Sequence, residues 1–202
     1  RRGVKTFYKS PLPLLFMNQL LKELKEHIPF TAIATIVAIL FVFIFKNLNT
    51  AIAFEILHPL HIITSAIVTS AIYFRYKKNI PLAIIIGITG SILIGSISDI
   101  IFPYLGALIF NFHPHFHLPI IEEPVMILSS ALIGTMIGIA TKITKFPHFI
   151  HVSLSVFASL FYITSFSTNP FNWIIAFFIV FIAVLLPCCI SDIIYPMLFI
   201  KE

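Results

Sequence analysis

Long apolar stretches separated by short polar segments are the main pattern along this chain. Six of them approach the roughly 20 residues that a helix needs to cross the hydrocarbon core of a bilayer. They cover residues 30–47, 57–74, 80–103, 123–141, 148–166 and 171–196. The runs are continuous rather than alternating, which favours helices over the strands of a transmembrane barrel. The pattern therefore predicts an all-α polytopic membrane protein with six transmembrane helices.

Composition agrees with this class and excludes others. Of the 202 residues, 59% are hydrophobic and 10% are charged, and the mean hydropathy is +1.04, typical of a polytopic membrane protein. The net charge of +5 comes without a basic stripe on a polar domain, so we expect no nucleic-acid partner. The two cysteines, Cys188 and Cys189, are adjacent, and neighbouring residues rarely form a disulfide, so they indicate no disulfide framework.

Basic residues predict the orientation in the membrane. Of the 13 lysines and arginines, all but Lys46 precede the first span, follow the last, or lie in the second and fourth loops. Positive residues concentrate on the cytoplasmic side, so we expect a plasma-membrane protein with both termini in the cytoplasm. Leucines alternate with charged residues over 12–27, which predicts an amphipathic helix on the inner surface of the membrane.

A polar and proline-containing pattern occurs twice. Residues 58–61 read His-Pro-Leu-His and residues 148–151 read His-Phe-Ile-His, with the pairs 90 positions apart. Residues 98–103 read Ser-Asp-Ile-Ile-Phe-Pro and residues 191–196 read Ser-Asp-Ile-Ile-Tyr-Pro, 93 positions apart. Ionisable side chains in lipid are costly and are kept mainly where they function. The spacing predicts a duplicated unit of three helices.

An odd number of spans per unit makes the second unit enter the bilayer from the opposite side. We therefore expect two inverted three-helix repeats related by a pseudo-two-fold axis in the membrane plane. The expected divisions are an N-terminal segment at 1–29, a first repeat at 30–110, an external histidine-rich loop at 111–122 and a second repeat at 123–202. The plan resembles that of small cation exchangers built from two inverted halves, in architecture alone.

This topology sorts the polar residues into two predicted groups. The outer group contains His58, His61, Asp99, Glu122 and Glu123, with Glu55 nearby. The inner group contains Glu26, His27, His148, His151 and Asp192.

Histidines three apart share one face of a helix, and two imidazoles with carboxylates suit Zn²⁺, Mn²⁺ or Fe²⁺ better than Mg²⁺ or Ca²⁺. Each group is therefore a candidate site for a divalent metal ion. The structural alternatives are histidines at the membrane interface and Ser-Asp segments that satisfy backbone groups freed by Pro103 and Pro196.

Three further features carry open alternatives. The loop histidines His113, His115 and His117 either collect metal weakly or belong to a headgroup-level loop anchored by Phe112 and Phe116. Cys188 and Cys189 precede Asp192 by about one turn and are either soft metal ligands or small packing residues. The Gly134-x-x-x-Gly138 pattern is typical of close helix packing in membranes.

Taken together, the residues predict an integral membrane transporter of a divalent metal cation, with protons as an expected coupling ion and a homodimer as a possible assembly. An intramembrane metal-dependent hydrolase is the first alternative, because a metal with an open position activates water. The duplication argues against it, since an enzyme normally needs one site. An ion channel or a subunit of a membrane complex is the second alternative.

Overall fold

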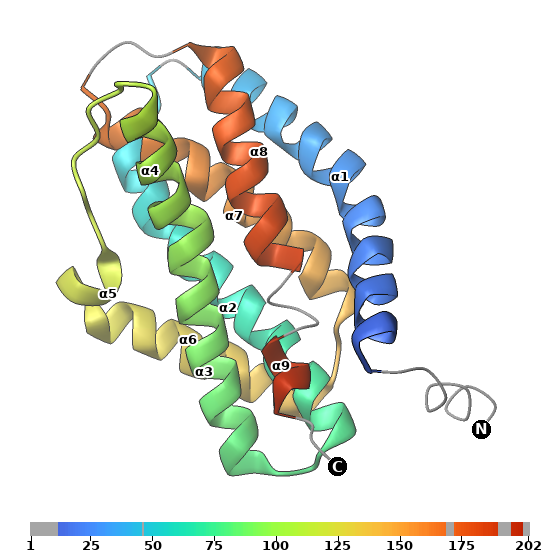
Figure 1. The fold of residues 1–202 in the computed structure, drawn as a ribbon. Coiled ribbons are helices and arrows are strands. Elements are labelled where there is room, and N and C mark those ends of the chain that lie inside the picture. Colours follow the sequence, from blue (N-terminus) through green and yellow to red (C-terminus); the bar gives the residue numbers. More distant parts are fainter. Residues whose placement is uncertain (1–11, 46, 169–171, 190–194, 200–202) are drawn as a thin grey trace.

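A computed structural model of the chain shows a bundle of helices (Figure 1). It describes residues 12–45, 47–168, 172–189 and 195–199, with the backbone alone at 12–23, 26, 145–148 and 189. The elements are α1 (Leu12–Ile44), α2 (Thr50–Tyr76), α3 (Ile80–Ser96), a π-helical turn η1 (Ile97–Ile101), α4 (Phe102–Ile109), α5 (Pro119–Glu122), α6 (Pro124–Thr141), α7 (Lys145–Phe166), α8 (Trp173–Cys189) and α9 (Tyr195–Leu198). The described secondary structure is thus helical, as the apolar runs predict.

Five helices of the described chain are long and apolar enough to cross a membrane. They are His27–Ile44, Thr50–Tyr76, Ile80–Ile109, Pro124–Thr141 and Phe149–Phe166. The sixth predicted span corresponds to α8, whose apolar part, Trp173–Cys188, is shorter than the other five. The rest of that predicted span runs into residues 190–194, which lie outside the described part of the chain.

The N-terminal helix differs from the expected division at residue 29. α1 runs from Leu12 to Ile44 without interruption and contains Pro29. The predicted surface helix and the predicted first span are therefore one continuous helix. Proline removes one backbone donor but does not break the helix here.

The third span contains an irregular turn at the predicted Ser-Asp segment. α3, η1 and α4 follow one another directly, and the Phe102 N–H donates to the Ile97 carbonyl, five residues back. Pro103 has no N–H, so an ordinary helix would leave the Asp99 carbonyl without its intrahelical donor. The wider π-helical turn accommodates the proline, and such turns are frequent at functional sites. The segment before Pro103 therefore forms a π-helical turn that contains Asp99.

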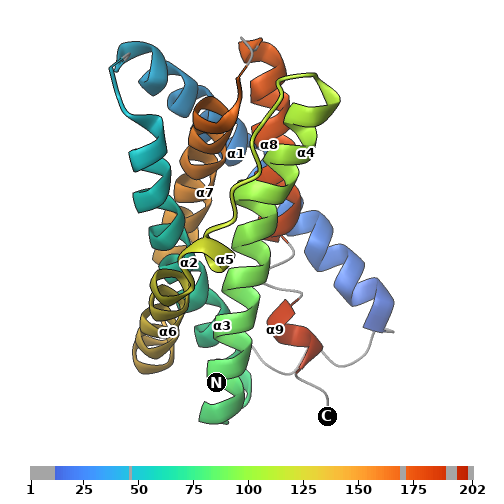
Figure 2. The same ribbon diagram turned by 90° about the vertical axis from the view of Figure 1, so that its left-hand side faces the viewer.

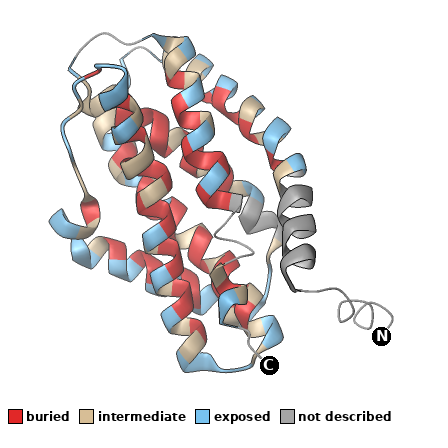
Figure 3. Ribbon diagram, viewed as in Figure 1, coloured by how far each residue is buried: buried red, intermediate tan, exposed pale blue. Residues whose placement is uncertain are grey.

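α2 and α7 form the central pair of the bundle (Figures 1 and 2). They are antiparallel, because Ser165 near the end of α7 donates to the Thr50 hydroxyl at the start of α2 at 2.8 Å. α6 packs against α2 and α3, whereas α1 packs against α8 and α7. Buried positions face the interior and exposed apolar positions face outward (Figure 3). An exposed apolar exterior is what a helix bundle in lipid requires.

Glycines let α6 approach α2 closely. A Cβ at Gly134 would meet the carbonyl oxygen of Ile63, and one at Gly138 would meet the carbonyl oxygen of Ile67. Small residues at such positions bring helix backbones into van der Waals contact in membranes. The close packing predicted for the Gly134-x-x-x-Gly138 pattern is confirmed.

The second and fourth loops lie at the same end of the bundle. The Arg75 guanidinium donates to the Lys142 carbonyl at 3.0 Å and is 3.4 Å from the Thr144 hydroxyl. Lys142 closes α6 in the left-handed conformation, with φ of 57°. Two of the predicted basic loops therefore share one end of the protein.

Candidate metal centre

Asp99 lies at the centre of a fully buried polar cluster. It sits on η1, and its Oδ2 accepts from the Nδ1–H of His58 at 2.8 Å and from the Nδ1–H of His61 at 2.6 Å. Both histidines are on one face of α2, as their i, i+3 spacing predicts, and each is 1% exposed. The predicted grouping of His58, His61 and Asp99 is therefore present in the structure.

Serines complete the environment of the Asp99 carboxylate. Its Oδ1 accepts from the Ser98 hydroxyl at 2.8 Å and from the Ser155 hydroxyl at 2.6 Å. One turn further along α7, Ser159 donates to the Ser98 carbonyl at 2.9 Å. Four donors thus surround one carboxylate, which matches its roughly four lone-pair positions. Such bonds compensate the cost of burying the negative charge.

The second histidine pair contributes to the same cluster. The ring of His151 on α7 lies 5.5 Å from the ring of His61, centroid to centroid. His61, His151 and Cys188 are all buried and can each offer one ligand atom within 4.8 Å of the others. His58, His61 and Asp99 form a second such group, so His61 belongs to both.

This arrangement corrects the predicted separation into outer and inner groups. The sequence placed His61 and His151 near opposite faces of the membrane, but their rings are in contact. The reason is that α2 and α7 cross as an antiparallel pair, and both residues occur about where the two helices meet. One continuous centre replaces two distant ones for these residues.

Comparisons with known proteins assign neither a family nor a function to the chain. The chain matches no protein-family model, no curated protein and no solved structure. The chemistry of the side chains is therefore the basis for any functional conclusion.

The glutamates predicted for the outer group lie outside the buried cluster. Glu55 and Glu122 both accept from His117, at 2.7 Å to its Nε2 and 2.8 Å to its Nδ1. Each ring nitrogen of His117 therefore already has a carboxylate partner, so this imidazole is not available to a metal ion in the described arrangement. Glu123 is exposed and precedes α6. Glu122 and Glu123 are therefore not brought to the buried cluster.

The backbone of the loop lowers the pKa of Glu122. The Leu118 N–H donates to Glu122 Oε1 at 3.0 Å and is the largest stabilising contact of the ionised form. Burial raises the pKa and offsets part of this effect, whereas the electrostatic interaction and the hydrogen bond with His117 lower the pKa further. Glu122 is therefore held as a carboxylate that fastens the loop to the start of α2 through His117.

Phe54 separates the His117 ion pairs from the buried cluster. Its ring stacks against His58 at 5.5 Å and contacts the edge of His117 at 5.8 Å, and it is fully buried. The centroid of the Tyr162 ring lies 5.4 Å from that of the Phe54 ring. An aromatic side chain thus lies between the part-buried His117 and the buried His58.

The loop histidines do not gather into one site. His117 turns inward to the two glutamates, whereas His113 and His115 are exposed. The predicted anchor Phe116 is 54% exposed, but Phe112 is 4% exposed and packs in the core. Of the two predicted aromatic anchors, Phe112 therefore does not anchor the loop at the surface, because it packs into the core shortly after the end of α4.

Four predicted residues remain to be placed. His27 is buried on α1 and is a member of neither candidate metal group in the described chain. Asp192 lies outside the described residues, as do the side chains of Glu26 and His148.

Two residues of the centre, Ser155 and Ser159, were not predicted. They follow His151 at intervals of four along α7, so they share its face, and this periodicity is the signal that could have identified them.

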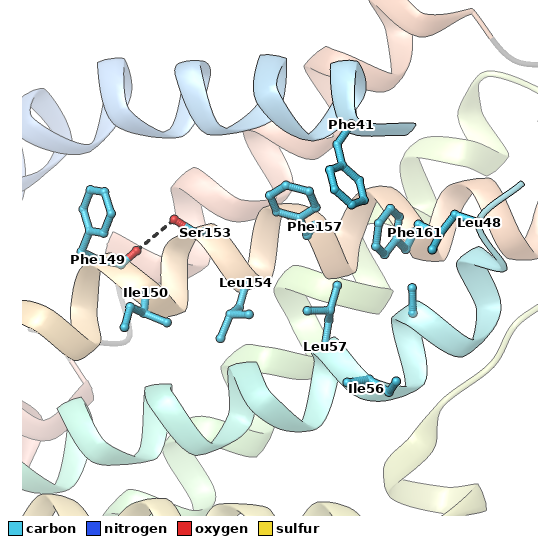
Figure 4. A pocket seen from close by; sticks show the side chains of 11 residues that line it. Phe41, Leu48, Ile56, Leu57, Phe149, Ile150, Ser153, Leu154, Phe157 and Phe161 are labelled. Carbon is cyan, nitrogen blue, oxygen red and sulfur yellow. Dashed lines mark hydrogen bonds between the residues drawn. The ribbon is translucent and has the colours of Figure 1, made fainter. Parts of the chain in front are cut away.

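A cavity away from this cluster is lined by apolar groups and offers no metal ligands. It measures about 510 Å³ and lies between α1, α2 and α7 (Figure 4). Apolar side chains such as Phe41, Leu57 and Phe157 line it. Its hydroxyl, Ser153, donates to the Phe149 carbonyl within the same helix at 3.1 Å. The cavity therefore offers apolar contact and is not a candidate metal site.

Proposed function

We propose that the protein is an integral membrane transporter of a divalent transition-metal cation of the zinc, manganese or iron class. The observation that carries the proposal is the fully buried Asp99 carboxylate, which fixes the imidazoles of His58 and His61 by their Nδ1–H groups. A hydrogen bond from one ring nitrogen to a carboxylate is the usual arrangement behind a metal-binding histidine, because it leaves the other nitrogen to bind the ion.

His58 adds an unsatisfied acceptor to this centre. Its Nε2 is buried and has no hydrogen-bond partner among the described residues. Buried polar atoms are nearly always satisfied, and an exception calls for an ion, a water or a function. A metal ion bound to this nitrogen supplies the missing partner, and the negative charge of Asp99 offsets part of the cost of bringing a cation into the bundle.

The inverted repeat is part of the proposal. Positions 61 and 151 are equivalent in the two sequence copies, and residues near a two-fold axis meet their own equivalents, as these two rings do. The pairing of α3 with α6 is matched by that of α8 with α1. These relationships support two inverted three-helix halves, with α8 and the following segment as the sixth span. Three points remain predictions from the charge distribution and the hydrophobic pattern. They are the location in the plasma membrane, the cytoplasmic side for both termini, and the position of the start of α1 at the membrane surface.

The repeat also relates Ser155 to Ser65 and Ser159 to Thr69. Ser155 and Ser159 donate to the Ser98–Asp99 segment. Ser65 and Thr69 are buried, and their hydroxyls have no hydrogen-bond partner in the described part of the chain. The repeat hypothesis makes Asp192 the counterpart of Asp99, so Asp192 is proposed as a second carboxylate of the ion path.

An intramembrane metal-dependent hydrolase is the second candidate. The convergence of His58, His61 and His151 on one centre favours it, because an enzyme needs one site. Hydrolysis also needs a general base beside the metal-bound water. Glu55 and Glu122 are held by His117, beyond the ring of Phe54, and neither is a member of a candidate metal group within the described chain. Transport is therefore the better match.

Flux of Zn²⁺, Mn²⁺ and Fe²⁺ into proteoliposomes tests the proposal. We expect metal uptake by the wild-type protein and its loss in Asp99→Asn and in Asp192→Asn, with Glu123→Gln as an exposed carboxylate control that retains flux. Size-exclusion profiles establish that the variants remain folded. Wild-type flux in both aspartate variants contradicts the proposed path, and metal-dependent ester hydrolysis without flux supports the enzyme instead.

A further inference from the structure

The group formed by His61, His151 and Cys188 differs chemically from the rest of the centre. It contains two imidazoles and a sulfur, each from a different helix, and every member is at most 1% exposed. Cys188 carries a thiol. The three ligand atoms come from three helices and lie within 4.8 Å of one another, so one metal ion could bind all three.

Asp99 determines which ring nitrogen of His61 can bind a metal ion. The carboxylate already accepts four hydrogen bonds, two at each oxygen. A carboxylate has about four lone-pair positions, so an ion bound directly to Asp99 would displace one of these donors. The Nδ1 of His61 is also engaged by Asp99, at 2.6 Å, which leaves Nε2 as the nitrogen with an available lone pair. Asp99 is thus a positioning group for His61 at this site.

We propose that His61, His151 and Cys188 form a metal-binding position that selects thiophilic ions, namely Zn²⁺ and its close analogue Cd²⁺, over Mn²⁺. Two imidazoles and a thiolate are a typical donor set for zinc, with a fourth position open. Hard ions such as Mn²⁺ prefer carboxylate, carbonyl and water oxygens. Binding converts the Cys188 thiol to a thiolate and releases its proton, so the bound ion faces one negative charge from sulfur and a second from Asp99.

This inference rests on the proposed function and narrows its substrate class. His61 belongs to both candidate groups, so it connects the proposed thiolate position to the pair formed by His58 and Asp99. The repeat pairs Cys188 with Gly95, which has no side chain. The sulfur is therefore present in one half alone, and it makes the two sides of the centre chemically different.

Titration of the purified protein with Cd²⁺ tests the assignment, since a cadmium–thiolate bond produces an ultraviolet charge-transfer band. We expect the band in the wild-type protein and in Cys189→Ser, and its loss in Cys188→Ser. The adjacent cysteine provides a control of the same chemistry one position away. We also expect Cys188→Ser to lower the affinity for Zn²⁺ and Cd²⁺ by at least about tenfold, and that for Mn²⁺ by less than about twofold.

A second measurement avoids substitution altogether. X-ray absorption at the zinc edge of the wild-type protein should show one sulfur at about 2.3 Å and two imidazole nitrogens at about 2.0–2.1 Å. A zinc shell without sulfur overturns the proposal, as does a charge-transfer band that persists in Cys188→Ser and disappears in Cys189→Ser.

Metal flux separates this inference from the proposed function. Wild-type Zn²⁺ flux with unchanged binding and flux in Cys188→Ser rejects the thiolate position and leaves transport intact. A Cys188-dependent band in a protein without metal flux supports the binding position and rejects transport.

Discussion

His61 on α2 and His151 on α7 face one another across the centre of the bundle, with ring centroids 5.5 Å apart. They occupy equivalent positions of two sequence copies separated by 90 residues. The contact joins the two halves of the chain at the place where ionisable groups are most deeply buried.

Removal of the Ser155 hydroxyl should destabilise the centre. Ser155→Ala deletes the 2.6 Å hydrogen bond to Asp99 and leaves that oxygen with one donor fewer. Bonds to a buried charged group contribute about 1.5–3 kcal/mol, so we expect a loss of that order in the free energy of unfolding. Denaturant unfolding in detergent measures it. The matched control is Ser153→Ala on the same helix, because the Ser153 hydroxyl donates to the Phe149 carbonyl within that helix. An equal loss of stability in the control would contradict the role of Ser155.

The buried histidines should bind metal more strongly than the loop histidines. Zn²⁺ should raise the melting temperature of the wild-type protein, because a ligand that binds the folded state alone stabilises it. Zinc at a hundred times its Kd adds about 2.7 kcal/mol. We expect this shift to vanish in His58→Ala/His61→Ala and to persist in His113→Ala/His115→Ala, which alters exposed loop residues. An equal loss in the loop variant would move the main site outward.

Stability should depend on pH through Glu122. The Leu118 N–H and His117 lower the pKa of Glu122 below its ordinary value of 4.5. An acid with a lowered pKa stabilises the folded state above its ordinary pKa, and this contribution is lost as the pH falls through the folded-state pKa. Glu122→Gln should therefore melt at a lower temperature than wild type at pH 7, and the difference should shrink as the pH falls below 4.5 and through the lower folded-state pKa.

Thermal melts of both proteins across this pH range measure the effect. Glu123→Gln, the exposed neighbour, should match wild type at every pH. A difference between wild type and Glu122→Gln that grows as the pH falls would contradict the assignment.

A methyl group at Gly134 should destabilise the bundle. Its Cβ would meet the Ile63 carbonyl oxygen, which is backbone and cannot move without shifting α2. Overpacking of this kind costs about 1–3 kcal/mol. Gly95→Ala is the control, because its Cβ would meet only the terminal Cδ1 of Ile62 closely, and this methyl group can turn about the last side-chain bond. Denaturation midpoints of the two variants should separate, and equal midpoints would show that α6 adjusts freely.

The helices were predictable from sequence because apolar runs of about 20 residues are a strong signal. The predicted pairs also hold, since His58 and His61 share a face and Gly134 and Gly138 form a close seam. These features depend on local periodicity, which the sequence carries directly.

Contacts between segments that are distant in the sequence were harder to predict. The sequence assigned His61 and His151 to opposite faces, because it fixes where each lies along its helix but not where two helices cross. It also grouped Glu122 with Asp99, although His117 holds Glu122 at the surface. The periodicity of α7 places Ser155 on the same face as His151, but its bond to Asp99 depends on the packing of α7 against η1, which is a long-range contact.

The glycine contacts of α6 also determine where α2 lies in the bundle. α6 touches the backbone of α2 at Gly134 and Gly138. Helices in such close contact cannot slide past one another without collision, so the seam fixes the position of α2 along α6. His58 and His61 belong to α2, whereas α6 contributes no residue to either candidate metal group in the described part of the chain. A helix without a candidate ligand therefore sets the position of two imidazoles of the centre.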